Sequence, residues 1–228
     1  MPIFGYIQVA IAAYLLGSIP FGFLVAKAKG VDIRNVGSGN IGATNAMRVL
    51  GKPAGILVLL LDALKGFGAC FLGALIYSYY FHQFSGLHST VDFIPLPSQE
   101  GMEHFLIIAG IFAVLGHNYP CWLKFKGGKG IATTAGVYLA LAPWALLVAL
   151  IVFILAVLIT RYVSVGSIAA AFALPVTVWI MSPGNPFLGI VTTALGLMAI
   201  YKHRSNIKRL MAGTENRLGK KESTEAAK

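Results

Sequence analysis

Long apolar stretches alternate with short polar ones along most of the chain. Six stretches are mostly apolar: Ile3–Ala26, Gly55–Phe81, Phe105–Gly116, Trp144–Ile159, Ser167–Met181 and Phe187–Ile200. A helix of about 20 mostly apolar residues crosses the hydrocarbon core of a bilayer. Only 11% of the 228 residues are charged, whereas soluble domains have about 25%. The pattern therefore predicts an all-α, polytopic integral membrane protein.

The positive charges lie between or beyond these stretches. Of the 18 Lys and Arg residues, only Lys65 lies inside one, and eight lie from Lys202 onward. The His82–His104 connection has three acidic residues and no Lys or Arg. Because cytoplasmic loops carry the excess of Lys and Arg, we expect the N-terminus outside. We also expect one membrane domain over residues 1–213 and a cytoplasmic tail over 214–228.

The number of crossings follows from the same rule. Arg161 and the Lys124–Lys129 segment must both be cytoplasmic, which requires two crossings in the residues between them. We therefore predict a short helix over Gly130–Leu141, a turn at Ala142–Trp144 and seven transmembrane helices in total. In the alternative, Gly130–Leu141 enters the bilayer and returns, which gives five crossings.

A glycine-rich polar segment, GSGNIGATNAMR, covers Gly37–Arg48. Glycines let successive backbone N–H groups converge on an oxyanion. The segment also carries neutral donors and a planar cation: Ser38, Asn40, Thr44, Asn45 and Arg48. If a short helix starts near Asn40, Thr44 and Arg48 share one face. The alternative is a glycine-rich turn, but the number of polar donors favours an anion site.

A second such segment, FKGGKGIATT, covers Phe125–Thr134. It differs from the phosphate loop of nucleotide hydrolases because Gly130, not Ser or Thr, follows Lys129. We therefore exclude a nucleotide hydrolase. What remains is a pair of lysines around a pair of glycines: Lys126, Gly127, Gly128 and Lys129. The N-terminus of the helix that follows favours negative charge.

A third polar segment, YKHRSNIKRLMAGTENR, is expected to extend the last apolar helix. His203 and Asn206 lie three residues apart and would share a face. The alternative is a basic tail attracted only to anionic lipid headgroups. The shorter RYVSVGS segment adds Ser164.

Asp62 and Lys65 lie three residues apart inside the second apolar stretch. Charges at such depth form pairs or mark function. We favour a structural ion pair.

Three segments in this order, GSGNIGATNAMR, GHNYPCWLKFKGGKGIAT and YKHRSNIKRLMAGTENR, closely resemble the signature motifs of the bacterial acyl-phosphate:glycerol-3-phosphate acyltransferases. GSIPFG at Gly17–Gly22, LDALKG at Leu61–Gly66 and RYVSVGS at Arg161–Ser167 are also similar to that family. The resemblance implies a multi-pass enzyme of the bacterial inner membrane with a cytoplasmic active site. It would transfer a fatty acyl group from acyl phosphate to the 1-hydroxyl of glycerol 3-phosphate, giving lysophosphatidic acid and inorganic phosphate.

The same resemblance implies membrane lipid as surroundings, an acyl-phosphate-producing enzyme as pathway partner, no nucleic acid and no cofactor. It assigns catalytic roles to five residues: Ser38, Thr44, Ser164, His203 and Asn206. It assigns phosphate binding to a larger set: Gly37, Ser38, Gly39, Asn40, Asn45, Arg48, Lys126, Gly127, Gly128, Lys129, Lys202 and Arg204. The acyl phosphate's own oxygen would accept the hydroxyl proton.

Within this set, Ser38 and the following amides would hold acyl phosphate, and Arg48, Lys126 and the tail cations would hold glycerol 3-phosphate. His203 and Asn206 would orient the reacting groups. The two glycine-rich motifs contain no carboxylate, and Asp62 and Glu215 are poorly placed for a general base. We expect no metal, because the candidate ligands lack ligand spacing: His117, His203 and Cys121.

Two other functions fit parts of the pattern. A small anion transporter or a phosphate-responsive lipid regulator would also have short helices ending at an anion. However, the polar motifs gather on one membrane face and show no inverted repeat. A lipid-binding scaffold does not explain two separate anion sites.

Overall fold

The computed structural model describes residues 2–85 and 100–219, and the regular elements in these ranges are all helical. The predicted all-α class is therefore confirmed. The chain forms two compact units, residues 1–143 and 144–228. Most of the acidic connection expected between His82 and His104 lies outside the described residues.

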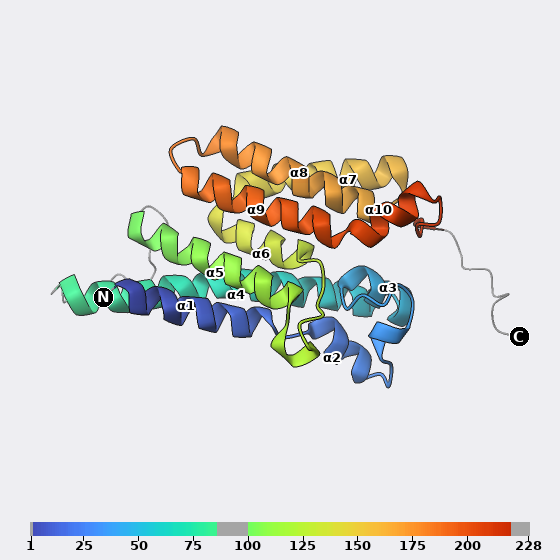
Figure 1. Ribbon diagram of the computed structural model, residues 1–228, viewed down its shortest axis with the longest axis horizontal. Coiled ribbons are helices and arrows are strands. Elements are labelled where there is room, and N and C mark those ends of the chain that lie inside the picture. Colours follow the sequence, from blue (N-terminus) through green and yellow to red (C-terminus); the bar gives the residue numbers. More distant parts are fainter. Residues whose placement is uncertain (1, 86–99, 220–228) are drawn as a thin grey trace, which may run out of the picture. The chain divides into compact units, whose positions relative to one another are not determined.

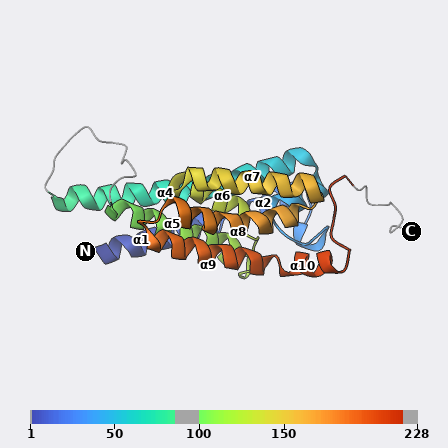
Figure 2. The ribbon, with the colours of Figure 1, turned by 90° about the horizontal axis from the view of Figure 1, so that it is seen from above.

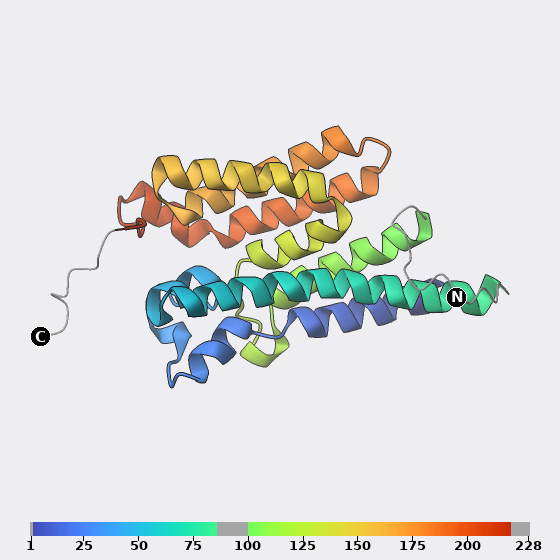
Figure 3. The ribbon, with the colours of Figure 1, turned by 180° about the vertical axis from the view of Figure 1, so that it is seen from behind.

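The first unit is a bundle of helices with two short helices at one end (Figures 1 and 3). Its elements are α1 (Pro2–Gly17), α2 (Phe21–Lys27), α3 (Ala43–Leu50), α4 (Lys52–Ser85), α5 (Glu100–Asn118) and α6 (Ile131–Leu141), with 3₁₀ turns η1 (Ile33–Asn35) and η2 (Cys121–Leu123). The long helix α4 lies between α1 and α6, and α5 packs against all three (Figure 3).

Helices α4 and α6 approach each other backbone to backbone. A side chain at Gly66 would overlap the Thr133 carbonyl, and one at Gly136 would overlap the Ala63 carbonyl. Small residues allow such contact between apolar helices, where packing takes the place of the hydrophobic effect. The short helix α6 is thereby fixed against the middle of α4.

The first apolar stretch does not form the single helix expected over Ile3–Ala26. Helix α1 ends at Gly17 and α2 begins at Phe21. Between them, Pro20 has φ −91° and ψ 72°. Proline has no N–H to donate and restricts the residue before it to extended conformations, so the helix is interrupted although the sequence remains apolar.

The second unit contains α7 (Pro143–Thr160), α8 (Val163–Met181), α9 (Pro186–Lys202) and α10 (Arg204–Met211). Figure 2 shows α8 and α9 side by side. The tail does not simply extend the last helix as expected, because the chain turns at His203, with φ −89° and ψ 6°. That turn separates the long apolar α9 from the short α10.

Five segments of the described chain are long and apolar enough to cross a membrane: Ile3–Ala28, Lys52–Tyr80, Gly101–Leu123, Pro143–Thr160 and Val163–Met181. Helices α6 and α9 are apolar but shorter. The short helix predicted over Gly130–Leu141 is confirmed as α6. At 1.5 Å per residue its 11 residues reach about 16 Å, half of a bilayer core of about 30 Å. The number of crossings stays a prediction.

Candidate active site

The Asn45 side chain fixes the conformation of the first glycine-rich loop. Its Oδ1 accepts the Ser38 N–H at 2.9 Å. Its Nδ2 lies 2.9–3.3 Å from three loop carbonyls, those of Ile33, Val36 and Asn40. A side chain at Gly37, where φ is +61°, would overlap the Asn45 amide. The sequence reasoning counted Asn45 as a phosphate donor, but in the structure its amide bonds to the loop itself.

Two of the backbone amides after Ser38 are also used within the loop. Gly39 N–H donates to the Val36 carbonyl at 3.1 Å, and Gly42 N–H donates to Asn40 Oδ1 at 2.8 Å. The loop therefore presents side chains more than amides. Gly37, Ser38 and Gly39 are exposed.

Helix α3 confirms the expected helix, although it begins at Ala43 instead of near Asn40. Thr44 is exposed and Arg48, one turn later, is half-buried. Among the described residues Arg48 has no ion-pair partner. Thr44 and Arg48 can therefore meet a ligand with a hydroxyl and a guanidinium on one face.

A neighbouring arginine, Arg34, is not available in this way. It pairs with Asp32 at 2.6 Å and lies over the Phe23 ring at 4.8 Å. Hydrogen bonds from the Arg34 side chain and backbone lower the pKa of Asp32 from 3.8 to about 2. The Arg34 guanidinium is therefore already bound within the protein, whereas that of Arg48 has no ion-pair partner among the described residues.

The second glycine-rich loop has a strained backbone. Lys124 and Phe125 have φ of +52° and +60°, a left-handed conformation that residues other than glycine rarely adopt. Such conformations persist where the surroundings hold them and occur often at functional sites. The next residue is Lys126, whose side chain is exposed.

The C-terminal carbonyls of α5 bind this loop. Gly127 N–H donates to the Asn118 carbonyl at 3.2 Å, and Gly128 N–H donates to the His117 carbonyl at 3.1 Å. Lys129 is half-buried, and α6 begins after Gly130 as predicted. These bonds occupy the Gly127 and Gly128 amides.

One buried apolar cluster lies beneath both loops. It contains residues from α2, η1, α3, α4 and η2, together with one from the first loop: Ala26, Ile33, Ile41, Ala46, Val58 and Leu123. Ala46 lies between Thr44 and Arg48, and Leu123 lies three residues before Lys126. Burial of apolar surface thus holds the two glycine-rich loops together in the first unit.

In the second unit, Glu215 joins the groups predicted from the C-terminal motif. Its Oε1 accepts a hydrogen bond from Asn206 Nδ2 at 2.7 Å, and its Oε2 accepts one from Arg209 Nε at 2.7 Å. Partial burial raises the pKa of Glu215, but interactions with Asn206, Ser164 and Arg209 outweigh this and hold the pKa below 4.5. Asn206 is therefore held by this carboxylate, while the Ser164 hydroxyl, which is also buried, has no hydrogen-bond partner in the described part of the chain.

The buried His203 ring is oriented by its own helix. Its Nδ1 lies 2.8 Å from the Ala199 carbonyl. A carbonyl can only accept, so Nδ1 carries a proton, and in the neutral imidazole Nε2 is then the acceptor.

The segment after α10 packs back on the α7–α8 turn. Leu218 N–H donates to the Arg161 carbonyl at 2.8 Å, and Arg161 has φ +62°. The Arg217 guanidinium lies 6.0 Å from the Tyr162 ring. The described part of the expected tail therefore belongs to the second unit.

The two tail cations that were predicted to bind phosphate, Lys202 and Arg204, lie on either side of the turn at His203. Lys202 is half-buried and Arg204 is exposed. The Arg204 guanidinium lies 4.6 Å from the Tyr201 ring. This contact holds Arg204 close to the end of α9.

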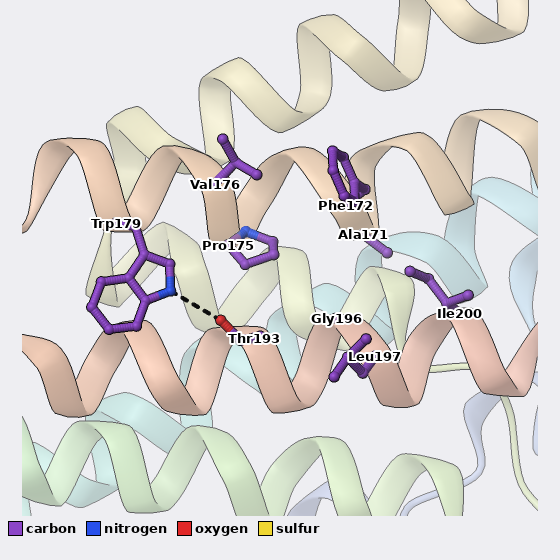
Figure 4. A pocket seen from close by; sticks show the side chains of 9 residues that line it. All are labelled: Ala171, Phe172, Pro175, Val176, Trp179, Thr193, Gly196, Leu197 and Ile200. Atoms are coloured by element: carbon purple, nitrogen blue, oxygen red, sulfur yellow. Dashed lines mark hydrogen bonds between the residues drawn. The ribbon is translucent and has the colours of Figure 1, made fainter.

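Helices α8 and α9 also enclose an apolar groove of about 240 Å³ (Figure 4). Pro175 and Gly196 line its middle and Phe172 and Leu197 lie on either wall. Trp179 Nε1 donates to Thr193 Oγ1 at 3.1 Å at one end. Most of its lining residues are apolar.

The structure thus gathers the predicted residues in two sets. The first unit brings together the glycine-rich loops: Gly37, Ser38, Gly39, Asn40, Thr44, Asn45, Arg48, Lys126, Gly127, Gly128 and Lys129. The second unit holds the C-terminal set: Ser164, Lys202, His203, Arg204 and Asn206. Sequence reasoning missed Glu215 as a partner of Asn206. The available signal was that Glu215 is the only acidic residue in an otherwise basic motif.

Comparison with known proteins gives one consistent result. A sequence model of the family described as glycerol-3-phosphate acyltransferase matches residues 7–213. The glycerol-3-phosphate acyltransferase of Desulforamulus reducens is 41% identical over 95% of this chain and 97% of its own. That of Desulfotalea psychrophila is 44% identical over 92% and 96%.

Two solved structures agree with this result. Both are described as PlsY (YgiH), an integral membrane glycerol 3-phosphate acyltransferase. The glycerol 3-phosphate form has a TM-score of 0.77 at 42% identity over 94% of this chain and 96% of that one. The lysophosphatidic acid form has a TM-score of 0.74 at 40% identity over 94% and 95%. With its sequence motifs, helical architecture and these matches taken together, the chain belongs to the glycerol-3-phosphate acyltransferase family.

Proposed function

We propose that the chain transfers a fatty acyl group from acyl phosphate to the 1-hydroxyl of glycerol 3-phosphate. The products are lysophosphatidic acid and inorganic phosphate. The observation that carries this proposal is the pair of glycine-rich loops on one apolar cluster, which present Arg48 and the exposed Lys126. Both substrates have a phosphate, and the related solved structures are of glycerol 3-phosphate and lysophosphatidic acid forms.

The reaction requires positioning more than a strong base. The hydroxyl oxygen of glycerol 3-phosphate attacks the acyl carbonyl carbon, the bond from that carbon to the phosphate oxygen breaks, and phosphate leaves. An oxygen of the leaving phosphate accepts the hydroxyl proton, so the atoms and charges balance without a protein carboxylate. Fixed donors and cations then accelerate the step by orientation and by stabilising developing charge.

The first unit supplies most of the phosphate-binding groups in this proposal. The Ser38 hydroxyl binds the acyl phosphate, and Arg48, Lys126 and the tail cations bind glycerol 3-phosphate. We assign Thr44, one turn before Arg48 on α3, to the same site. Asn45 acts through the loop, because its amide bonds to Ser38 and three carbonyls. A planar guanidinium suits phosphate because it donates two parallel bonds.

The second unit supplies the orienting groups. Glu215 fixes the Asn206 amide by a hydrogen bond of 2.7 Å. The His203 ring is fixed by the Ala199 carbonyl. We assign His203 and Asn206 to orienting the reacting groups, and Ser164 to the same site.

Donor specificity tests the proposed function directly. Purified protein in lipid should form lysophosphatidic acid from acyl phosphate and glycerol 3-phosphate, and should not form it from acyl-CoA. The physical reason is that a thioester brings no phosphate oxygen to accept the proton. Product formation is followed with labelled glycerol 3-phosphate. Comparable turnover with acyl-CoA would contradict the substrate-assisted mechanism.

We further propose seven crossings in a single membrane domain over residues 1–213, with the N-terminus outside and residues 214–228 in the cytoplasm. The five long apolar segments and the two shorter helices α6 and α9 support this number. The active site then faces the cytoplasm of the inner membrane. An enzyme that produces acyl phosphate would supply the donor as the pathway partner.

Cysteine labelling of intact cells tests this topology. In a background without native cysteines, Gly184→Cys should react with an impermeant maleimide from outside, and Ser205→Cys should not. Both positions are exposed and they lie at opposite ends of α9, so each is the control for the other. If Ser205→Cys reacts from outside the cell, the proposed orientation is wrong and the C-terminal end of α9 is extracellular.

A further inference from the structure

Three ionisable side chains that the proposed mechanism does not use are buried together in the first unit. Asp62 and Lys65 in α4 and His117 in α5 are 2%, 4% and 5% exposed. Lys65 Nζ lies 2.8 Å from Asp62 Oδ1, which confirms the expected ion pair. Buried ion pairs are costly to desolvate and contribute little net stability. The other contacts of these three side chains therefore indicate what role they have besides stability.

Lys65 binds the break between α1 and α2. Its Nζ donates to the Ile19 carbonyl at 2.8 Å and lies 5.6 Å from the centre of the Phe21 ring. Ile19 lies in the break itself, two residues after the end of α1, and its carbonyl also accepts the Phe21 N–H at 3.1 Å. The Lys65 ammonium therefore fixes the end of α1 and the start of α2, which contributes Ala26 to the apolar cluster under both loops.

Asp62 connects the pair to the second glycine-rich loop through His117. His117 Nδ1 lies 3.5 Å from Asp62 Oδ1. The opposite edge of the ring lies against the loop, because a side chain at Gly128 would overlap His117 Nε2. The His117 carbonyl also accepts the Gly128 N–H at 3.1 Å. His117 therefore fills the space between Asp62 and a residue two positions from Lys126.

The loop needs support of this kind. Lys124 and Phe125, directly before Lys126, have positive φ, and such a backbone persists only where its surroundings hold it. Two backbone bonds from α5 fix Gly127 and Gly128. The direction of the α5 end, and so of these bonds, is set where His117 packs against α4.

We propose that Asp62 and His117, with Lys65 neutralising the Asp62 charge, form a positioning network that fixes the second glycine-rich loop, and with it the Lys126 ammonium. The network acts through Lys126 and does not touch the reacting atoms. It rests on the proposed function, in which Lys126 binds the phosphate of glycerol 3-phosphate. A misplacement of about 1 Å in a positioned group can cost roughly 100-fold in rate.

Two double variants separate this role from that of a structural ion pair. Asp62→Asn/Lys65→Met and Asp62→Leu/Lys65→Met both remove the two charges together, which is far less damaging than removing one of them. An asparagine in place of Asp62 keeps a polar group of the same size beside His117 Nδ1, 3.5 Å from the present carboxylate oxygen, whereas a leucine side chain has no polar atom. We expect the Leu variant to raise KM for glycerol 3-phosphate about tenfold, consistent with partial misplacement of the bound group, and to leave KM for acyl phosphate within about twofold.

In the Asn variant, KM for both substrates should stay within about threefold of the wild-type value, because the polar contact between residue 62 and His117 survives. His104→Leu is the control within α5, since His104 is exposed at the other end of that helix, and it should match the wild type. Thermal stability of each variant in the same lipid is measured alongside. Equal KM values for the two double variants, at any stability, would overturn the positioning role.

Hydrogen exchange gives a readout that does not depend on activity. The backbone amides of residues 121–130 should exchange faster in the Leu variant than in the Asn variant. If the wild type forms no lysophosphatidic acid, the proposed function is wrong. The exchange rates of residues 121–130 then still show whether Asp62 and His117 fix the loop. Should the Leu variant not fold, His117→Asn keeps a donor near the Nδ1 position but removes the ring from Gly128. It should then show the same rise in exchange and in KM, and wild-type values would overturn the proposal.

Discussion

Lys126→Ala should lower kcat/KM for glycerol 3-phosphate by roughly 30- to 4,000-fold. The side chain is exposed on a strained loop in the first unit, and in the proposed function it binds a substrate phosphate. In the proposed complex the bound substrate covers this ammonium, and removing one partner of a buried, hydrogen-bonded charge pair costs about 2–5 kcal/mol. At about 1.4 kcal/mol per tenfold change this gives the stated range. Steady-state kinetics on purified, equally folded protein measure it.

Lys208→Ala is the matched control. It removes the same charge from α10, where Lys208 is exposed, and it should lower kcat/KM by less than about threefold, as expected for a weak exposed contact. If the cations acted only through anionic headgroups, each would contribute about 1 kcal/mol and the two variants would behave alike. Equal, mild defects in both would remove Lys126 from the proposed site.

Most of the helical framework could be predicted from the apolar stretches, because a membrane-spanning backbone must bond within its own segment. The predicted bounds were too narrow where helices continue into polar residues. Helix α4 covers Lys52–Ser85 instead of Gly55–Phe81. The interruption at Pro20 was missed because hydropathy does not change there. The helix is interrupted there by the backbone restrictions of proline and not by a change in polarity.

The candidate site could be predicted as a set of segments but not as a set of contacts. The glycines and cations of the two loops indicate phosphate binding through their composition alone. Whether the Asn45 amide points into the loop or away from it depends on the turn at Gly37, with φ +61°, which composition does not specify. The bond from Asn206 to Glu215 spans nine residues across a helix end, and helical periodicity gives no signal across such a break.

Glu215→Ala should lower kcat/KM by about 10- to 150-fold and should also lower the melting temperature. The carboxylate side chain is only 7% exposed, and it accepts hydrogen bonds from Asn206 and Arg209, both at 2.7 Å. Without it, Asn206 loses the group that orients its amide. Hydrogen bonds to a charged group are worth about 1.5–3 kcal/mol, which converts to the stated loss if a correctly oriented Asn206 is required for turnover. Kinetics and thermal unfolding in one lipid preparation measure both effects.

Asp32→Asn is the control, because Asp32 and Arg34 form a carboxylate–arginine pair of similar length, 2.6 Å, at the exposed surface. Exposed pairs contribute little, so activity should change less than about threefold.

The pH dependence of stability gives a second check on the role of Glu215. The pKa of Glu215 lies below 4.5 in the folded protein, so its contribution is fully present above about pH 4.5 and is lost as the pH falls through the lower folded value. Glu215→Gln should therefore lose less stability than the wild type over that acid range. An unchanged acid profile, together with wild-type kinetics in Glu215→Ala, would show that the carboxylate does not orient Asn206.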